Sequence, residues 1–145
     1  MENKEFKKLF NEIAKSNGFQ SAFGSWFKES DECIASLFLQ KSNYGNYYEL
    51  NIKTFIQGLF GETHKKGKVL KNAVGDLFTR QPQEYNDVLT LENSMEIDDR
   101  KNRLEKLFSD FIVPETNQTL SRAGIIELAR NGEFILPAVK KELGL

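Results

Sequence analysis

The first seventeen residues show the apolar periodicity of an α-helix. Over residues 3–17 the apolar side chains recur at intervals of three and four, while lysines and glutamates occupy the other positions: Phe6, Leu9, Phe10 and Ile13. Asn3 is placed to cap the start of this helix, and Gly18 is placed to end it. The pattern predicts an amphipathic helix whose apolar side packs on another apolar layer.

Residues 19–57 have the pattern of three strands separated by turn-forming clusters. The first strand is expected at Phe19–Lys28, with a bend at Gly24, and the second at Cys33–Lys41. The segment Ser42–Asn46 carries the residues of a hairpin turn. The third strand is expected at Tyr47–Ile56, so these segments predict an antiparallel meander.

Polarity alternates within the third predicted strand. One side carries Tyr48, Leu50, Ile52 and Ile56, and the other carries Tyr47, Glu49, Asn51 and Lys53. Such alternation is typical of an antiparallel sheet with one buried and one solvated face, whereas strands of a parallel, doubly covered sheet are apolar throughout. The pattern therefore disfavours a doubly wound α/β fold.

The segment after the third strand is harder to interpret. Residues 57–72 contain three glycines and several lysines, which suggests a long, mobile connection. Val69–Arg80 is a candidate fourth strand that ends before Pro82. Val88–Leu91 is either a short fifth strand or the segment that leads into the next helix.

The helical period returns from Ser94 onward. An apolar stripe predicts a helix that Ser94 caps and Pro114 stops: Ile97, Leu104, Leu107, Phe108, Phe111 and Ile112. A second helix begins at Ser121 with Leu120 and Ile125 as a hydrophobic staple, and a short last helix is expected around 137–143. The prediction is one α+β domain over residues 1–145: an N-terminal helix, an antiparallel sheet of about four strands and three C-terminal helices.

Composition places this domain among soluble globular proteins. The chain has 145 residues, of which 39% are hydrophobic, and its single cysteine excludes an internal disulfide. No window is apolar for the roughly 18 residues that a membrane span needs, and the N-terminus lacks the apolar region of a signal peptide. We therefore expect a cytoplasmic protein without a membrane partner.

One stretch resembles a known family. It comprises Asn17–Phe19, Trp26–Phe27, the LFLQKS segment of Leu37–Ser42, Tyr44–Gly45 and the YELNI segment of Tyr48–Ile52. The stretch is similar to the uncharacterised bacterial family called domain of unknown function 4304. The resemblance implies a small cytosolic α+β domain with a helix, an antiparallel sheet and C-terminal helices. It implies no activity, because no catalytic residues are assigned to that family.

The residues that usually carry catalysis are few. His64 is the only histidine and lies beside Lys65 and Lys66, where a solvated loop residue is the simpler interpretation. Cys33 follows Asp31 and Glu32, and it shares one side of its strand with Ala35, Leu37 and Leu39, which predicts a buried, unreactive thiol. No catalytic, metal-binding or phosphate-binding motif is present, so we expect no catalytic residue, cofactor or metal.

Charge is nearly balanced, at a net −1, but unevenly distributed. Lys65, Lys66, Lys68 and Lys71 form a basic cluster that predicts a solvated loop, because the glycines around it follow no phosphate-binding pattern. Residues 81–99 lack any Lys or Arg and carry six acidic residues: Glu84, Asp87, Glu92, Glu96, Asp98 and Asp99. One interpretation of this stretch is an acidic surface that binds a protein partner. The simpler one, for the last three acids, is their favourable position in the first turn of a helix.

The solvated side of the sheet and its hairpin form the candidate binding surface. They gather amides, hydroxyls, a lysine and aromatic rings in one region: Gln40, Ser42, Tyr44, Tyr47, Glu49, Asn51 and Lys53. Such groups suit a peptide or a small polar ligand. An ordinary solvated sheet face with cross-strand pairs is the simpler interpretation of the same residues.

Three functional hypotheses stay open. The favoured one is a non-enzymatic protein-interaction module of the immunity-protein or regulatory type, since tyrosine is common in interfaces and no catalytic set is present. The alternative is a small-ligand-binding protein or enzyme with a pocket between the sheet and the C-terminal helices. Nucleic-acid binding through Lys65, Lys66 and Lys68 with the sheet aromatics is disfavoured by the balanced charge. The oligomeric state is not predicted.

Overall fold

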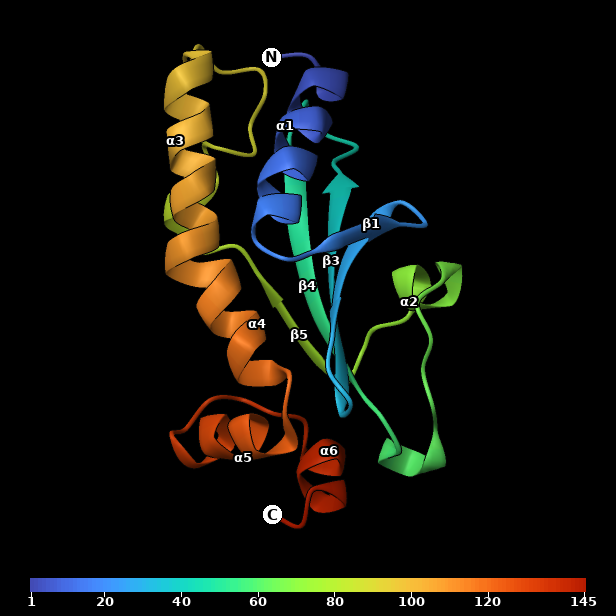
Figure 1. Ribbon diagram of the computed structural model, residues 1–145. Helices are drawn as coiled ribbons and strands as arrows, with labels where there is room; N and C mark the ends of the chain where they lie inside the picture. Colours follow the sequence, from blue (N-terminus) through green and yellow to red (C-terminus); the bar gives the residue numbers. More distant parts are fainter.

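A five-stranded antiparallel sheet organises the molecule (Figure 1). A computed structural model describes all residues, 1–145, and the strands are ordered β1-β2-β3-β4-β5 as they follow in the chain. Their bounds are β1 Gln20–Ala22, β2 Ser25–Glu29, β3 Cys33–Lys41, β4 Tyr48–Ile56 and β5 Leu77–Arg80. The predicted α+β class and antiparallel sheet are confirmed, with five strands in place of the four expected.

The additional strand arises at Gly24, where the sequence suggested only a bend. Phe23 and Gly24 both adopt left-handed backbone conformations, with φ of 54° and 74°. Two consecutive residues of this kind make the tight turn of a hairpin, so the chain reverses and Ala22 faces Ser25. The predicted single strand is therefore two strands, β1 and β2.

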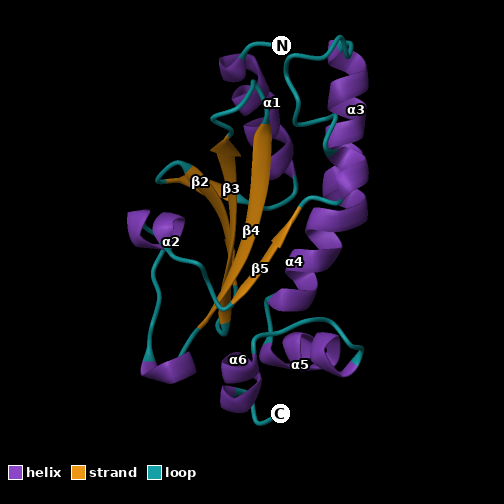
Figure 2. Cartoon of the chain, turned by 180° about the vertical axis from the view of Figure 1, so that it is seen from behind, coloured by secondary structure: helices purple, strands orange, loops and turns teal.

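Three helices, α1, α5 and α6, and a long helical rod accompany the sheet (Figures 1 and 2). Their bounds are α1 Asn3–Ser16, α3 Ile97–Leu107, a π-helical turn Phe108–Ile112, α4 Val113–Thr119, α5 Arg122–Arg130 and α6 Pro137–Glu142. In the main core the ring of Phe10 in α1 lies 5.2 Å from that of Phe108 and 4.6 Å from that of Trp26 in β2. Aromatic packing of this kind joins α1, the rod and one face of the sheet. No helix is long and apolar enough to span a membrane.

The expectation that Pro114 stops its helix is wrong. The rod passes from α3 through the π-helical turn into α4, and Pro114 occupies the start of α4. Proline lacks the N–H that an α-helix interior needs, but it is tolerated in a first turn, and the wider π-turn shifts the hydrogen-bond register just before it. The helix therefore continues to Thr119.

Two of the predicted helix caps are also wrong. Asn3 is already helical, and the N-cap residues of α1 and α3 are Glu2 and Glu96, neither of which makes a side-chain cap bond. Ser94 lies outside α3 because that helix starts at Ile97. The third cap is confirmed, since Ser121 Oγ accepts a hydrogen bond from the Gly124 amide at 3.0 Å.

β4 is a strand as predicted, but its second face is drier than expected. Asn51 is 7% exposed and Lys53 6%, and only Glu49 near the hairpin stays half-exposed. A short helix, α2 (Lys68–Asn72), lies near this face, and Lys53 Nζ donates to the carbonyls of Lys71 and Ala73 at 3.0 and 2.6 Å. On this face of β4, solvent exposure is therefore confined to the hairpin end of the strand.

The candidate fourth strand is extended only in its second half. Residues 68–72 form α2, and β5 begins at Leu77. The segment 88–91 is neither a regular strand nor a helix, since its one ladder contact is the bridge between Tyr47 and Thr90. Its apolar side chains are buried in the main core all the same.

Candidate functional site

Three of the polar residues that the sequence singled out on the sheet form cross-strand contacts with each other or with Arg80: Gln40, Glu49 and Asn51. Asn51 Nδ2 donates to Gln40 Oε1 at 3.0 Å, and Arg80 Nε donates to Asn51 Oδ1 at 3.2 Å. Arg80 also pairs with Glu49 at 3.4 Å. These cross-strand contacts satisfy the groups that were expected to face a ligand, which favours the interpretation as an ordinary sheet surface.

The remaining members of that set do not converge with them. Lys53 is enclosed beside α2, and Ser42 Oγ accepts from the amide of Tyr44 inside the hairpin turn. Tyr44 is 94% exposed, and Tyr47 is half-buried where it lines a polar hollow of about 350 Å³ with Glu49 and Arg80. The structure thus separates the predicted surface into a set of cross-strand polar contacts, an enclosed lysine and an exposed hairpin turn.

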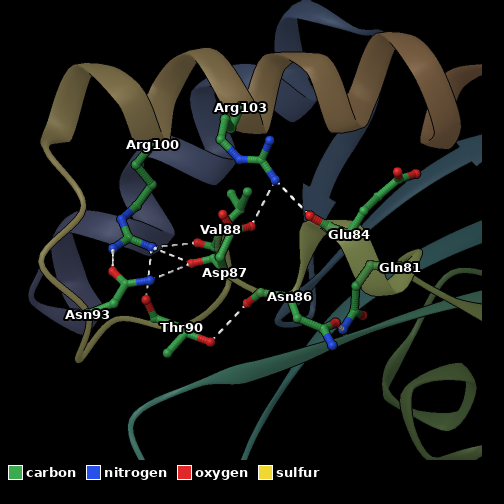
Figure 3. A network of polar contacts seen from close by, with 9 residues as sticks. All are labelled: Gln81, Glu84, Asn86, Asp87, Val88, Thr90, Asn93, Arg100 and Arg103. Carbon is green, nitrogen blue, oxygen red and sulfur yellow. Dashed lines mark hydrogen bonds and ion pairs between the residues drawn. The ribbon is translucent and has the colours of Figure 1, made fainter.

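A buried arginine of α3, Arg100, forms hydrogen bonds with the acidic segment 87–93 that precedes this helix (Figure 3). The guanidinium of Arg100 is fully enclosed, and its Nη1 donates to the carbonyls of Val88 at 2.7 Å, Thr90 at 3.0 Å and Asp87 at 3.3 Å. Its Nη2 donates to Asn93 Oδ1 at 2.6 Å. No carboxylate pairs with this side chain, so Arg100 holds the irregular segment through main-chain oxygens.

Arg103, one turn further along α3, contacts residues of the same region at the protein surface (Figure 3). It forms an ion pair with Asp87 at 2.8 Å, and it donates to the carbonyl of Glu84 at 2.7 Å. Glu92 accepts a bond from the amide of Asn46 at 3.2 Å. Part of the acidic stretch therefore has an internal structural role.

The other candidates from the sequence occupy structural positions. Cys33 is fully buried, and burial together with the nearby Glu32 carboxylate raises the pKa of its thiol to about 11. The main chain of His64 is held by the Gln57 side chain, and its ring lies 5.3 Å from that of Phe55. Lys66 pairs with Glu29 at 3.2 Å.

The state of Cys33 gives a direct prediction. A thiol with a pKa of about 11 is almost entirely protonated at pH 8, and only the thiolate reacts with disulfide reagents. We expect Ellman's reagent to leave the native protein unlabelled for hours and to label one thiol at once in 6 M guanidinium chloride. Rapid labelling of the native protein would contradict the enclosed position of Cys33.

A cleft lies between the sheet and the C-terminal helices, where the alternative hypothesis placed a pocket, but none of the candidate binding residues lines it. Its volume is about 450 Å³. The sheet side comprises β4, β5 and the loop before β5, and the opposite side comprises α4, α5 and the segment 133–136 (Figure 2). The lining residues are Ile52, Thr54, Val74, Gly75, Asp76, Leu77, Phe78, Thr79, Glu115, Thr119, Leu128, Glu133, Phe134, Ile135 and Leu136.

Packing around Thr119 shapes the inner part of this cleft. Thr54 Oγ1 in β4 donates to Thr119 Oγ1 in α4 at 2.9 Å, and both side chains are buried. The start of α5 packs so tightly on the end of α4 that a Cβ atom at Gly124 would lie 2.0 Å from the Gln118 carbonyl oxygen. These contacts set the angle at which α5 leaves α4, and hence the width of the cleft.

The rim of the cleft is apolar and exposed. Phe134 is 83% exposed and Leu136 47%, whereas Ile135 between them is buried in a small core with Ile125. Across the cleft, Val74 is also exposed. Large apolar side chains that gather around a hollow mark a contact surface more often than isolated ones do.

The outer edge of β5 borders this rim. β5 is the last strand of the sheet, and it pairs only with β4. Apart from that pairing, no hydrogen bond involves the main-chain groups of residues 77–80. An edge strand in this condition offers free N–H and C=O groups to a further strand.

Comparisons with known proteins identify the family but no activity. A family model described as domain of unknown function (DUF4304) matches residues 10–118, which confirms the resemblance found in the sequence. No curated protein and no solved structure gives a significant match to the chain.

Proposed function

Since the chain belongs to DUF4304, a family whose description names no activity, we propose from its geometry that it is a non-enzymatic protein-interaction module. The module binds an extended segment of a partner protein along the outer edge of β5. Side chains of that segment enter the neighbouring cleft. A regulatory or immunity-type role in the cytoplasm fits a domain that acts by occupying part of another protein.

The unpaired edge of β5 is the observation that carries this proposal. Proteins usually protect such edges with charges, prolines or covering segments, because a free edge pairs readily with another chain. β5 has a single charged residue, Arg80, and its neutral Phe78 is exposed. Addition of a strand at a sheet edge is a common mode of peptide recognition.

The cleft would determine which side chains a segment bound at this edge can carry. Alternate side chains of a strand point to opposite faces of the sheet, so every second residue of an added strand would face the cleft. Leu77 and Thr79 of β5 already line the cleft, and Phe134 and Leu136 stand on its far side. The bound segment therefore places apolar residues between β5 and the segment 133–136.

A display experiment tests the proposal without a known partner. A library of random nine-residue peptides on phage is selected on the immobilised wild-type protein and on a Phe134→Ser/Leu136→Ser variant. We expect the wild type to enrich sequences with apolar residues at every second position and the variant to retain them at least tenfold less. Both replaced side chains are exposed, so the variant should fold normally.

The control variant is Tyr44→Ser, which removes an exposed aromatic ring from the hairpin at the opposite end of the sheet. It should enrich the same peptides as the wild type. No enrichment on the wild type, or equal enrichment on the Phe134/Leu136 variant, would overturn the proposal.

A small-ligand-binding or enzymatic role is the second candidate. Its support is a cleft of a size typical of ligand sites, with the carboxyl groups of Glu115 and Glu133 in its lining. This candidate would replace the first if the protein enriched no peptide while a small molecule raised its melting temperature, and if Glu115→Gln removed that rise.

A further inference from the structure

The cleft beside β5 is acidic. Of its charged lining residues all three are carboxylates, Asp76, Glu115 and Glu133, and no Lys or Arg lines it. They come from three separate elements: the loop before β5, α4 and the segment after α5. The rest of the lining is apolar or carries hydroxyl groups.

The glutamates of the cleft have no internal counter-ion. The three ion pairs of the molecule involve Glu29, Glu49 and Asp87, and no hydrogen bond reaches the side chain of Glu115 or Glu133. This distinguishes the cleft from the sheet surface, where acidic groups are already paired.

The local environment disfavours the charged forms of Glu115 and Asp76. Partial burial raises the pKa of Glu115, and the negative charge of Glu133 raises it further. Burial likewise raises the pKa of Asp76, but its Oδ2 accepts a hydrogen bond from the Ile56 amide at 2.8 Å. A positive charge placed in the cleft would relieve the repulsion between Glu115 and Glu133.

We propose that the segment bound at β5 carries a lysine or arginine that enters the cleft and pairs with Glu115 and Glu133. This inference rests on the proposed function, and it specifies the chemistry of the partner. The apolar walls suit such a residue, because the aliphatic part of a long basic side chain packs on apolar surface while its charge reaches the carboxylates. Leu77 and Ile135 supply that surface.

The bound motif is therefore an extended segment in which a basic residue alternates with apolar residues on the same side of the strand. An added strand brings one side chain to the cleft every second residue, so the basic residue has apolar neighbours two positions before and after it. Those neighbours meet the exposed Phe134 and Leu136 at the rim.

Synthetic peptides with blocked ends test this motif. The reference peptide is Ser-Thr-Ile-Thr-Lys-Thr-Ile-Thr-Ser, and two analogues carry Met or Glu in place of the central Lys. We expect fluorescence anisotropy to give at least tenfold weaker binding for the Met analogue and still weaker binding for the Glu analogue. This is the size of effect that one charge-assisted contact produces.

A double variant assigns that preference to the cleft. Glu115→Gln/Glu133→Gln removes two charges without changing side-chain shape, and we expect it to bind the Lys and Met peptides within a factor of two. The matched control, Glu12→Gln/Glu105→Gln, removes two exposed charges from α1 and α3 and should keep the full tenfold preference.

The outcomes separate the two proposals. If the wild type binds the Lys and Met peptides equally well, the basic residue is excluded while the edge-binding function stands. If the preference survives in the Glu115/Glu133 variant, it arises outside the cleft and the inference fails. If no peptide of the series binds, both proposals are overturned.

Discussion

Replacing Arg100 by methionine is expected to lower the free energy of unfolding by about 3–5 kcal/mol. The buried guanidinium donates hydrogen bonds to three main-chain carbonyls and to the side chain of Asn93. Methionine fills similar space but has no hydrogen-bond donor. The carbonyls of Val88 and Thr90 would stay enclosed without their donor, which costs about 1–3 kcal/mol for each group. Urea unfolding followed by the fluorescence of Trp26, the single tryptophan, measures the change.

The control for this variant is Arg103→Met, one turn away on the same helix. Arg103 is partly exposed, and its ion pair with Asp87 lies at the surface, where such pairs contribute about 0–1 kcal/mol. Similar losses in the two variants would contradict the view that Arg100 fastens the segment 87–93 to α3.

A Gly124→Ala variant is expected to lose about 3 kcal/mol, at the upper end of the usual cost of an overpacked site. The new Cβ atom would meet the Gln118 carbonyl oxygen at 2.0 Å and Ser121 Oγ at 3.0 Å. Because the nearer atom belongs to the main chain of α4, the strain cannot be relieved by a side-chain rotation. Relief requires α5 to move away from α4, which is measurable as a lower midpoint of urea unfolding.

Gly132→Ala is the matched control for the helix junction. No atom lies within 4 Å of a Cβ placed at Gly132, so only its positive φ of 89° opposes the substitution. We expect a loss of about 1 kcal/mol. If Gly124→Ala were equally mild, the α4–α5 contact would not be the rigid junction that shapes the cleft.

Local sequence patterns predicted most of the secondary structure. The period of two in β4 and the helical period of α1 report the immediate environment of each side chain, so they could be recognised without tertiary information. The turn at Phe23 and Gly24 was missed because phenylalanine rarely adopts a positive φ. The five-residue helix α2 was missed because it is too short to show a helical period.

The exposure of individual side chains was harder to predict. Lys53 was expected in solvent, but carbonyls about twenty residues away in the chain accept its hydrogen bonds. Ile97 was placed on the apolar stripe of its helix and is 60% exposed, while Arg100 occupies the buried side. A local signal existed, since Arg100 precedes the buried Leu104 by four residues and so shares its side of the helix.

The sequence suggested a pocket between the sheet and the C-terminal helices only as an alternative, and the residues that line it could not be predicted because tertiary packing brings them together. The cleft joins residues 52–79 to residues 115–136, and no local pattern indicates that these segments meet. The only trace is the run from Glu133 to Leu136, in which Phe134 and Leu136 are apolar and exposed on either side of the buried Ile135. The polar residues chosen on the sheet were recognisable by pattern and cross-strand pairing was one interpretation of them, but their pairing with Arg80 was not predicted.

Hydrogen exchange of the main-chain amides, measured by NMR with and without the reference lysine peptide, tests the edge-binding proposal most directly. An added strand supplies hydrogen-bond acceptors to the outer edge of β5. We expect exchange to slow by at least tenfold for amides within residues 77–80, with no comparable change at the hairpin residues 42–47. Unchanged exchange in β5 with the peptide bound, or protection concentrated at the hairpin, would contradict the edge-binding proposal.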